Sequence, residues 1–202
     1  MEQQGMISDI EPGKFFVELV PAGFEKNAHL FPKELGSLRA SISFELSGAG
    51  GGVWTLSMHS GKLIGEKGED PERILKLIQS REDWACSMRG EKGFRLELPG
   101  EGSGKNLSQE LLLNQEKIER LKSIKGSIKF KLTDLVKGDW EITAVFGPET
   151  HPEPDCTITM GAADALAIRE GKLSPQTAFM AGKINIKGDM GLALQIGAVL
   201  MS

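Results

Sequence analysis

Histidine and cysteine are the side chains in this chain best suited to catalysis or metal binding, and their spacing favours neither. The three histidines, His29, His59 and His151, lie far apart, and none has a partner at the spacing of a helical zinc site. We interpret each as a surface or loop residue. Cys86 and Cys156 have no metal-binding spacing and could form at most one disulfide, so we expect two reduced, buried thiols.

One acidic segment and two glycine-rich segments remain as candidate sites. GPETHPEPDC, residues 147–156, gathers acidic, histidine and cysteine side chains, but its prolines favour a stiff, solvated turn. PGEGSGKN, residues 99–106, is similar to a phosphate-binding loop, yet Pro99 replaces the first glycine and Asn106 the final serine or threonine. SGAGGG, residues 47–52, joins two expected strands and no helix follows it. With no Gly-x-Ser-x-Gly motif either, we expect no enzyme activity, no metal and no cofactor.

Composition excludes several further classes of protein. With 202 residues, 40% of them hydrophobic, the chain can bury a core as one large domain or two small ones. The 28 acidic and 24 basic residues are scattered, which argues against nucleic-acid binding and against a polybasic membrane patch. No signal peptide and no apolar run of ~18 residues is visible, so we expect a cytoplasmic protein with no membrane insertion and at most transient membrane contact.

An internal repeat relates the two parts of the chain. SLRASISFEL at 37–46 aligns with SIKGSIKFKL at 123–132, an offset of 86 residues, and both alternate apolar and polar side chains as strands do. The same offset, without a gap, places Trp54 on Trp140 in the strand that follows. The order of strand, tryptophan strand and helix favours duplication.

The helices of the repeat align at a smaller offset. At 81 residues, SREDWACSMRG (80–90) lies over GAADALAIREG (161–171), so that both segments end in glycine. A loop that is five residues shorter in the second copy explains the change of offset. The helix expected at 107–122, with Ile118 and Leu121 on its apolar stripe, precedes the second copy.

The C-terminal segment is rich in hydrophobic side chains and is divided into short elements by glycine. CTITM at 156–160 predicts a strand, and residues 162–170 predict a helix that ends at a glycine. Ser174, followed by proline, begins a second helix that Gly182 ends. GKINIKG predicts a strand with one apolar face, and the helix that begins after Asp189 is apolar almost all round.

These motifs carry a resemblance to a known family. DCTITM with its helix, followed by GKLSPQTAFMAGKINIKGDMGLALQI, resembles the C-terminal half of the sterol carrier protein type 2 family, and the resemblance covers about residues 107–200. It implies a sheet with helices over one face and, between them, a hydrophobic tunnel for fatty acids, acyl-CoAs, sterols or other lipids. Residues 10–106 resemble the family only weakly, through the repeat, and lack counterparts of KLSPQTAFMAG and of the last helix.

The predicted fold class is therefore α+β, with two tandem sterol-carrier-like units. Each is expected to be a mixed, largely antiparallel sheet covered by helices on one face, the first unit at 1–106 being incomplete and the second at 107–202 complete. The sequence leaves open whether the two copies share one sheet or pack face to face.

The resemblance and the apolar pattern together imply a set of ligand-binding residues in the second unit. Gln176 is expected near the mouth of the tunnel, and the lining is expected to comprise Trp140, Ile142, Ile158, Met160, Leu166, Phe179, Met180, Ile184, Met190 and Leu194. The function implied is non-catalytic intracellular binding or transfer of a lipid ligand. The alternative is a structural or interaction module with a filled cavity, which pairs with or docks onto a protein partner.

Overall fold

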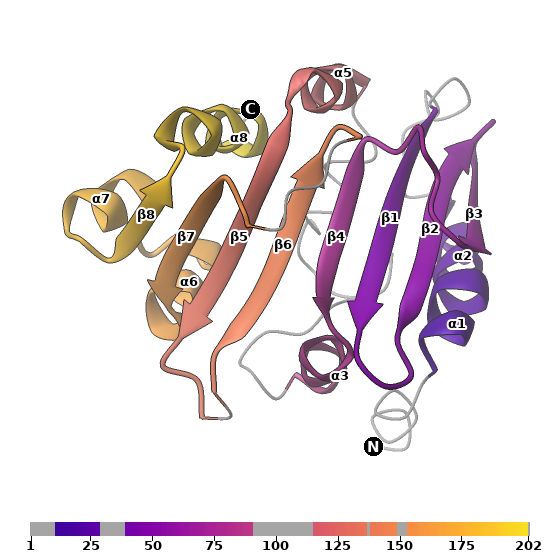
Figure 1. The fold of residues 1–202 in the computed structure, drawn as a ribbon, viewed down its shortest axis with the longest axis horizontal. Coiled ribbons are helices and arrows are strands. Elements are labelled where there is room, and N and C mark those ends of the chain that lie inside the picture. Colours follow the sequence, from indigo (N-terminus) through magenta and orange to yellow (C-terminus); the bar gives the residue numbers. More distant parts are fainter. Residues whose placement is uncertain (1–10, 29–38, 91–114, 137, 149–152, 202) are drawn as a thin grey trace.

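The computed structural model describes residues 11–28, 39–90, 115–136, 138–148 and 153–201. Its centre is one eight-stranded sheet in the order β3-β2-β1-β4-β6-β5-β7-β8 (Figure 1). The strands are β1 (Ala40–Ser47), β2 (Gly52–His59), β3 (Lys62–Lys67), β4 (Leu75–Ser80), β5 (Gly126–Thr133), β6 (Trp140–Phe146), β7 (Cys156–Gly161) and β8 (Ile184–Gly188). The helices are α1 (Pro12–Lys14), the π-helix η1 (Phe15–Leu19), α2 (Val20–Lys26), α3 (Arg81–Arg89), α5 (Gln115–Ser123), α6 (Ala162–Arg169), α7 (Pro175–Met180) and α8 (Met190–Met201).

The two copies suggested by the sequence lie in this single sheet. We call the elements from α1 to α3 the N-terminal half and those from α5 to α8 the C-terminal half. Antiparallel pairing of β4 with β6, with Leu77 opposite Ala144, joins the halves. The sequence left open whether the two parts share one sheet or pack face to face. The structure shows one shared sheet, because β4 lies beside β6 as β3 lies beside β2.

Strand register within the halves follows the two sequence offsets. β1 pairs with β4 in parallel, with Phe44 opposite Leu77, and β5 pairs with β7 in parallel, with Phe130 opposite Ile158. These pairs differ by 86 and 81 residues, the offsets of the aligned strands and helices. The glycines that follow α3 and α6, Gly90 and Gly171, both take left-handed backbone angles, which glycine adopts without steric cost.

The tryptophans of the repeat lie on corresponding strands and faces but at different positions. Phe44 of β1 faces Trp54, whereas Phe130 of β5 faces Ile142, and Trp140 faces Leu132. The ungapped alignment of Trp54 with Trp140 is therefore wrong by two residues. The connection between β5 and β6 is longer than that between β1 and β2, and it accommodates the extra residues with positive φ at positions that include Asp134.

A helical segment that the sequence analysis did not predict covers the N-terminal half. The ring of Phe16 in η1 stacks on Trp54 at 5.7 Å and also contacts Phe44 at 4.7 Å, both distances being between ring centroids. Gly65 of β3 makes this approach feasible, because a Cβ atom there would lie 2.0 Å from the carbonyl oxygen of Phe16. Phe16, Val20 and Phe24 are spaced four apart, and this helical period was the signal that could have revealed the cover.

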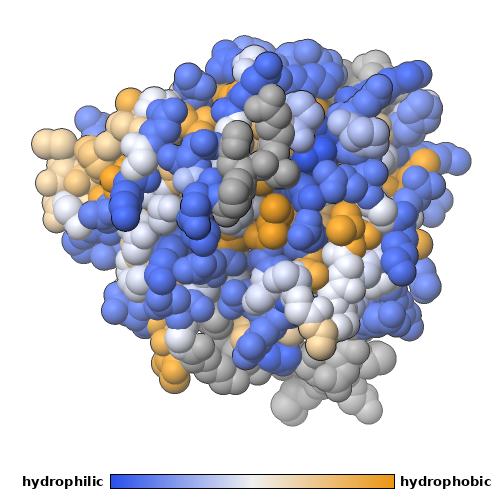
Figure 2. Space-filling model, viewed as in Figure 1, coloured by the Kyte–Doolittle hydropathy of each residue, from blue (hydrophilic) through white to orange (hydrophobic). Residues whose placement is uncertain are grey.

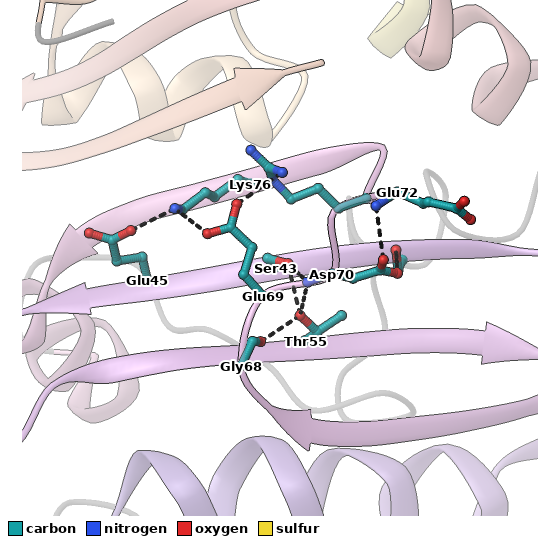
Figure 3. Close-up of polar contacts among 10 residues, drawn as sticks. Ser43, Glu45, Thr55, Gly68, Glu69, Asp70, Glu72 and Lys76 are labelled. Atoms are coloured by element: carbon teal, nitrogen blue, oxygen red, sulfur yellow. Dashed lines mark hydrogen bonds and ion pairs between the residues drawn. The ribbon is translucent and has the colours of Figure 1, made fainter. Parts of the chain in front are cut away.

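The opposite face of the sheet is polar and, in Figure 2, largely hydrophilic toward the viewer. In the N-terminal half the connection from β3 to β4 crosses this face and is held by side chains (Figure 3). Lys76 contacts Glu45 and Glu69, each at 2.7 Å between Nζ and a carboxylate oxygen. The connection also brings Asp70 to Ser41, whose hydroxyl donates to the carboxylate at 2.6 Å.

A similar contact holds the C-terminal half. Ser127, which the offset of 86 places on Ser41, donates its hydroxyl to Asp155 at 3.0 Å, and the Asp155 N–H donates back to that hydroxyl. Such a serine and aspartate pair satisfies polar groups of strand and connection together. This repeated contact was not predicted from the sequence.

Candidate functional site

The two halves differ in how completely the apolar face of the sheet is covered. In the N-terminal half most side chains on this face are buried, including Ile42, Leu46 and Trp54, while Phe44 and Leu77 are partly buried. In the C-terminal half Ile128, Ala144 and Cys156 are also buried, but the other side chains that line the same face are only half-buried: Phe130, Leu132, Trp140, Ile142, Ile158, Met160, Ile184 and Ile186. Figure 1 shows α2 behind β2 and β3 and α6 behind β5 and β7, on the side away from the viewer. The apolar face of β5 to β8 is therefore the candidate site.

Local signals position the helices around this face. Ser174 caps α7 by accepting the Thr177 N–H at 3.0 Å, and Asp189 caps α8 by accepting the Leu192 N–H at 3.0 Å. The predicted boundaries of these two helices are confirmed. Lys183, directly before β8, pairs with Asp164 of α6. This ion pair ties the segment that carries α7 to the helix that precedes it.

The helix α8 presents its two sides differently. Leu192, Ile196 and Val199 are buried and belong to the same core as Ile118 and Leu121 of α5, which confirms the apolar stripe expected of that helix. Met190 and Leu194, which were predicted as lining residues, are exposed, Leu194 by 67%. The buried side of α8 was not included in the prediction.

The predicted residues of α6 and α7 lie at the surface. Leu166, Gln176, Phe179 and Met180 are all exposed, Met180 by 79%. Hydrophobic side chains gather at the left end of the molecule in Figure 2, where Figure 1 places α7. The structure thus divides the predicted site into half-buried residues on the sheet, namely Trp140, Ile142, Ile158, Met160 and Ile184, and exposed residues on the helices.

The N-terminal half contributes to this site at the junction of the sheet. The indole N–H of Trp140 donates to the hydroxyl of Ser87 in α3 at 3.0 Å. Gln79 of β4 is buried and lies on the face that Leu77 shares with Ala144. Neither Ser87 nor Gln79 was among the predicted binding residues, because only the pairing of β4 with β6 places them next to the second copy.

Reactive groups are sparse around the apolar face. Within the described ranges no three histidine, cysteine or acidic side chains lie close enough to hold a metal ion. Cys156 is buried, and burial, with Asp189 and Asp155 nearby, raises the pKa of its thiol, which disfavours the nucleophilic thiolate. Cys86 is also a buried, free thiol, as expected. Glu149, His151 and the glycine-rich segment at 99–106 lie outside the described residues.

Comparison with known proteins identifies the class of the C-terminal half. Residues 106–201 match the sequence model of the SCP-2 sterol transfer family, so this part of the chain contains a domain of that family. Sterol carrier protein 2 of Rattus norvegicus is 39% identical over 95 residues, which cover 43% of this chain and 17% of that protein. Hydroxysteroid dehydrogenase-like protein 2 of Xenopus laevis is 28% identical over 138 residues, covering 65% of this chain and 32% of that protein. The match thus spans well under half the length of either relative.

Solved structures of the same family are similar to part of the chain. The apo form of sterol carrier protein 2 from Yarrowia lipolytica is 26% identical, covering 43% of this chain and 74% of that one, with a TM-score of 0.32. Sterol carrier protein domain 2 of Helicoverpa armigera is 28% identical, covering 50% of this chain and 93% of that one, with a TM-score of 0.35. Among the described helices, none is both long and apolar enough to cross a membrane.

Proposed function

We propose that this protein binds a lipid, without catalysis, against the apolar face of β5 to β8 and carries or transfers it inside the cell. The observation that supports this most directly is the contrast on one face of one sheet. The N-terminal half buries most of its share beneath the aromatic side chains of η1, whereas much of the share of the C-terminal half, including Phe130, Trp140 and Ile184, is only half-buried. The match of residues 106–201 to the SCP-2 sterol transfer family supports the same function.

Apolar burial alone is strong enough for such binding. A chain of about sixteen carbons, at ~0.8 kcal/mol for each buried methylene, gains at most about 12 kcal/mol before the costs of association. Micromolar binding therefore needs no charged anchor. This agrees with the half-buried residues of the site, which are all apolar apart from the indole N–H of Trp140.

We propose also that the chain is a duplication in which the first unit no longer binds a ligand. The matching strand registers, the repeated contact between serine and aspartate, and the glycine at the end of both α3 and α6 support this interpretation. The side chains of Phe16 and Trp54 occupy the face of the first unit where a ligand would lie in the second. Binding is therefore expected at one site in each chain.

Uptake of a fluorescent fatty acid tests the location of the site. Phe179→Asp should abolish uptake, because an unpaired carboxylate beside an apolar ligand is unfavourable by several kcal/mol. Ile64→Asp is the matched control, since Ile64 of β3 is 43% exposed and Phe179 is 42% exposed. Both variants must remain folded by circular dichroism. Equal uptake by the parent and a folded Phe179→Asp variant would place the ligand elsewhere.

The alternative of an interaction module has its own support. Met180 and Leu194 are exposed hydrophobic side chains on neighbouring helical segments, as expected of a surface that contacts another protein. Native mass spectrometry of the purified chain distinguishes the two functions. A measured mass that exceeds that of the chain by the mass of a co-purifying lipid supports lipid binding. A lipid-free protein that also takes up no fatty acid favours the interaction module.

A further inference from the structure

The side chain of Gln79 lies where the two halves of the sheet meet. On β4, Leu75, Leu77 and Gln79 point to the apolar face, because they pair with Ile42, Phe44 and Leu46 of β1. Since β4 also pairs with β6, Gln79 is flanked by the closed core of the N-terminal half on one side. On its other side lies the strand that carries Ile142 and Trp140.

Gln79 has an unused hydrogen-bond acceptor in this position. The residue is 9% exposed, and its side-chain oxygen Oε1 is buried without any hydrogen-bond partner. Buried amide oxygens in folded proteins nearly always accept a hydrogen bond, so an unsatisfied one calls for an explanation. The indole N–H on this side of the junction does not supply the bond, since the Trp140 Nε1 donates to Ser87.

We propose that Gln79 is the polar contact of the lipid site and accepts a hydrogen bond from a hydroxyl group of the ligand. This inference rests on the proposed function and adds a ligand class to it. Because the partnerless atom is an acceptor, it favours a group that donates. A carboxylate or an ether oxygen cannot donate and would leave Oε1 unsatisfied. The site therefore selects lipid alcohols, and β4 and α3 of the N-terminal half form one side of it.

This assignment gives the N-terminal half a role in binding although its own face is closed. Ser87 holds the Trp140 indole by a hydrogen bond and so positions one side of the site. Gln79 supplies selectivity for ligands with a hydroxyl group, because such a group donates a hydrogen bond to the otherwise unsatisfied Oε1. Discrimination between ligands of equal apolar length is then expected to depend on a residue outside the part that matches the family.

Two ligands that differ only in the donor test the proposal. Hexadecan-1-ol and its methyl ether are each titrated, from a cyclodextrin carrier, against a fluorescent fatty acid bound to the full chain. The parent protein should bind the alcohol roughly tenfold more tightly than the ether, the difference expected for one buried hydrogen bond. Gln79→Met, which keeps the length of the side chain but removes the acceptor, should weaken alcohol binding and bring the two affinities within about twofold.

The control variant is Gln195→Met, because Gln195 is an exposed glutamine on α8 and should leave the preference for the alcohol unchanged. A parent protein that binds both ligands equally, or a Gln79→Met protein that still prefers the alcohol, overturns the role of Gln79 while lipid binding itself stands. An equal loss of both affinities in Gln79→Met overturns it as well, because it indicates a structural role. If the parent takes up neither the ligands nor the probe, the proposed function fails and this inference with it.

Discussion

Phe16 is the residue on which closure of the N-terminal half depends. It is almost completely buried, and its ring lies within 6.1 Å of four other aromatic rings, those of Phe15, Phe44, Trp54 and Trp84. Removal of a buried phenylalanine side chain costs about 3–5 kcal/mol of unfolding free energy. Aromatic pairs add roughly 0.5–1.5 kcal/mol each beyond area burial, which places Phe16→Ala at the upper end of that range.

Urea denaturation followed by tryptophan fluorescence measures this loss, because Trp54 and Trp84 both contact the deleted ring. Val17→Ala is the control, since Val17 is the next residue of η1 and is exposed, so its truncation should change the unfolding free energy by less than about 0.5 kcal/mol. A loss below about 1 kcal/mol for Phe16→Ala would refute the assigned packing. Under conditions where the variant remains folded, fatty acid uptake should persist; its disappearance would show that ligand binds to the N-terminal half.

Three further changes test particular contacts. Gly65→Ala should lower the unfolding free energy by about 1–3 kcal/mol, because the added Cβ atom meets the Phe16 carbonyl oxygen; unchanged stability would contradict the close approach. Ser127→Ala and Ser41→Ala should each lower the unfolding free energy by about 1–3 kcal/mol in a thermal or urea scan, because each leaves polar groups of a connection unsatisfied. An effect in only one of the two variants would contradict the interpretation of the chain as a duplication. Burial disfavours the charged form of Lys76, but the ion pairs with Glu45 and Glu69 outweigh burial and raise the pKa of the lysine. The ion pairs therefore stabilise the fold fully below pH 10.5, and this stabilisation is lost as the pH rises through the folded-state pKa. A Lys76→Met variant should therefore lose less stability than the parent in that alkaline range, and parallel losses would refute the assignment.

Elements with local signals were predictable, whereas those defined by distant pairing were not. The cap at Ser174, the stop at Gly182 and the alternation in β8 each depend on a few adjacent residues, and the structure confirms these boundaries. The junction of β4 with β6 depends on two strands far apart in the sequence, neither of which shows its partner in its own pattern.

For the candidate site, the sequence predicted which side chains share a face of the sheet, but not how exposed each side chain is. Period-two alternation identified which side chains of β6 and β7 share a face. On α8 the same reasoning was insufficient, because a helix that is apolar almost all round does not reveal which side meets the core. Leu192 and Leu194 are identical in type and two residues apart, yet one is buried and the other exposed, and only packing against α5 separates them.

The register at the junction supplies a physical reason why the backbone of η1 can lie directly on the sheet in the N-terminal half. In the N-terminal half, Leu56 of β2 pairs with Gly65, and the absence of a side chain there lets the backbone of η1 lie directly on the sheet. In the C-terminal half the residue that corresponds to Leu56 by its pairing with β5 is Ala144, and its neighbour across the strands is Leu77. A leucine side chain at this position keeps a helical backbone from approaching as closely as η1 does. This difference concerns the junction alone, because Ala144 and Ile128 are themselves buried, whereas Ile142 and Trp140 farther along β6 are half-buried.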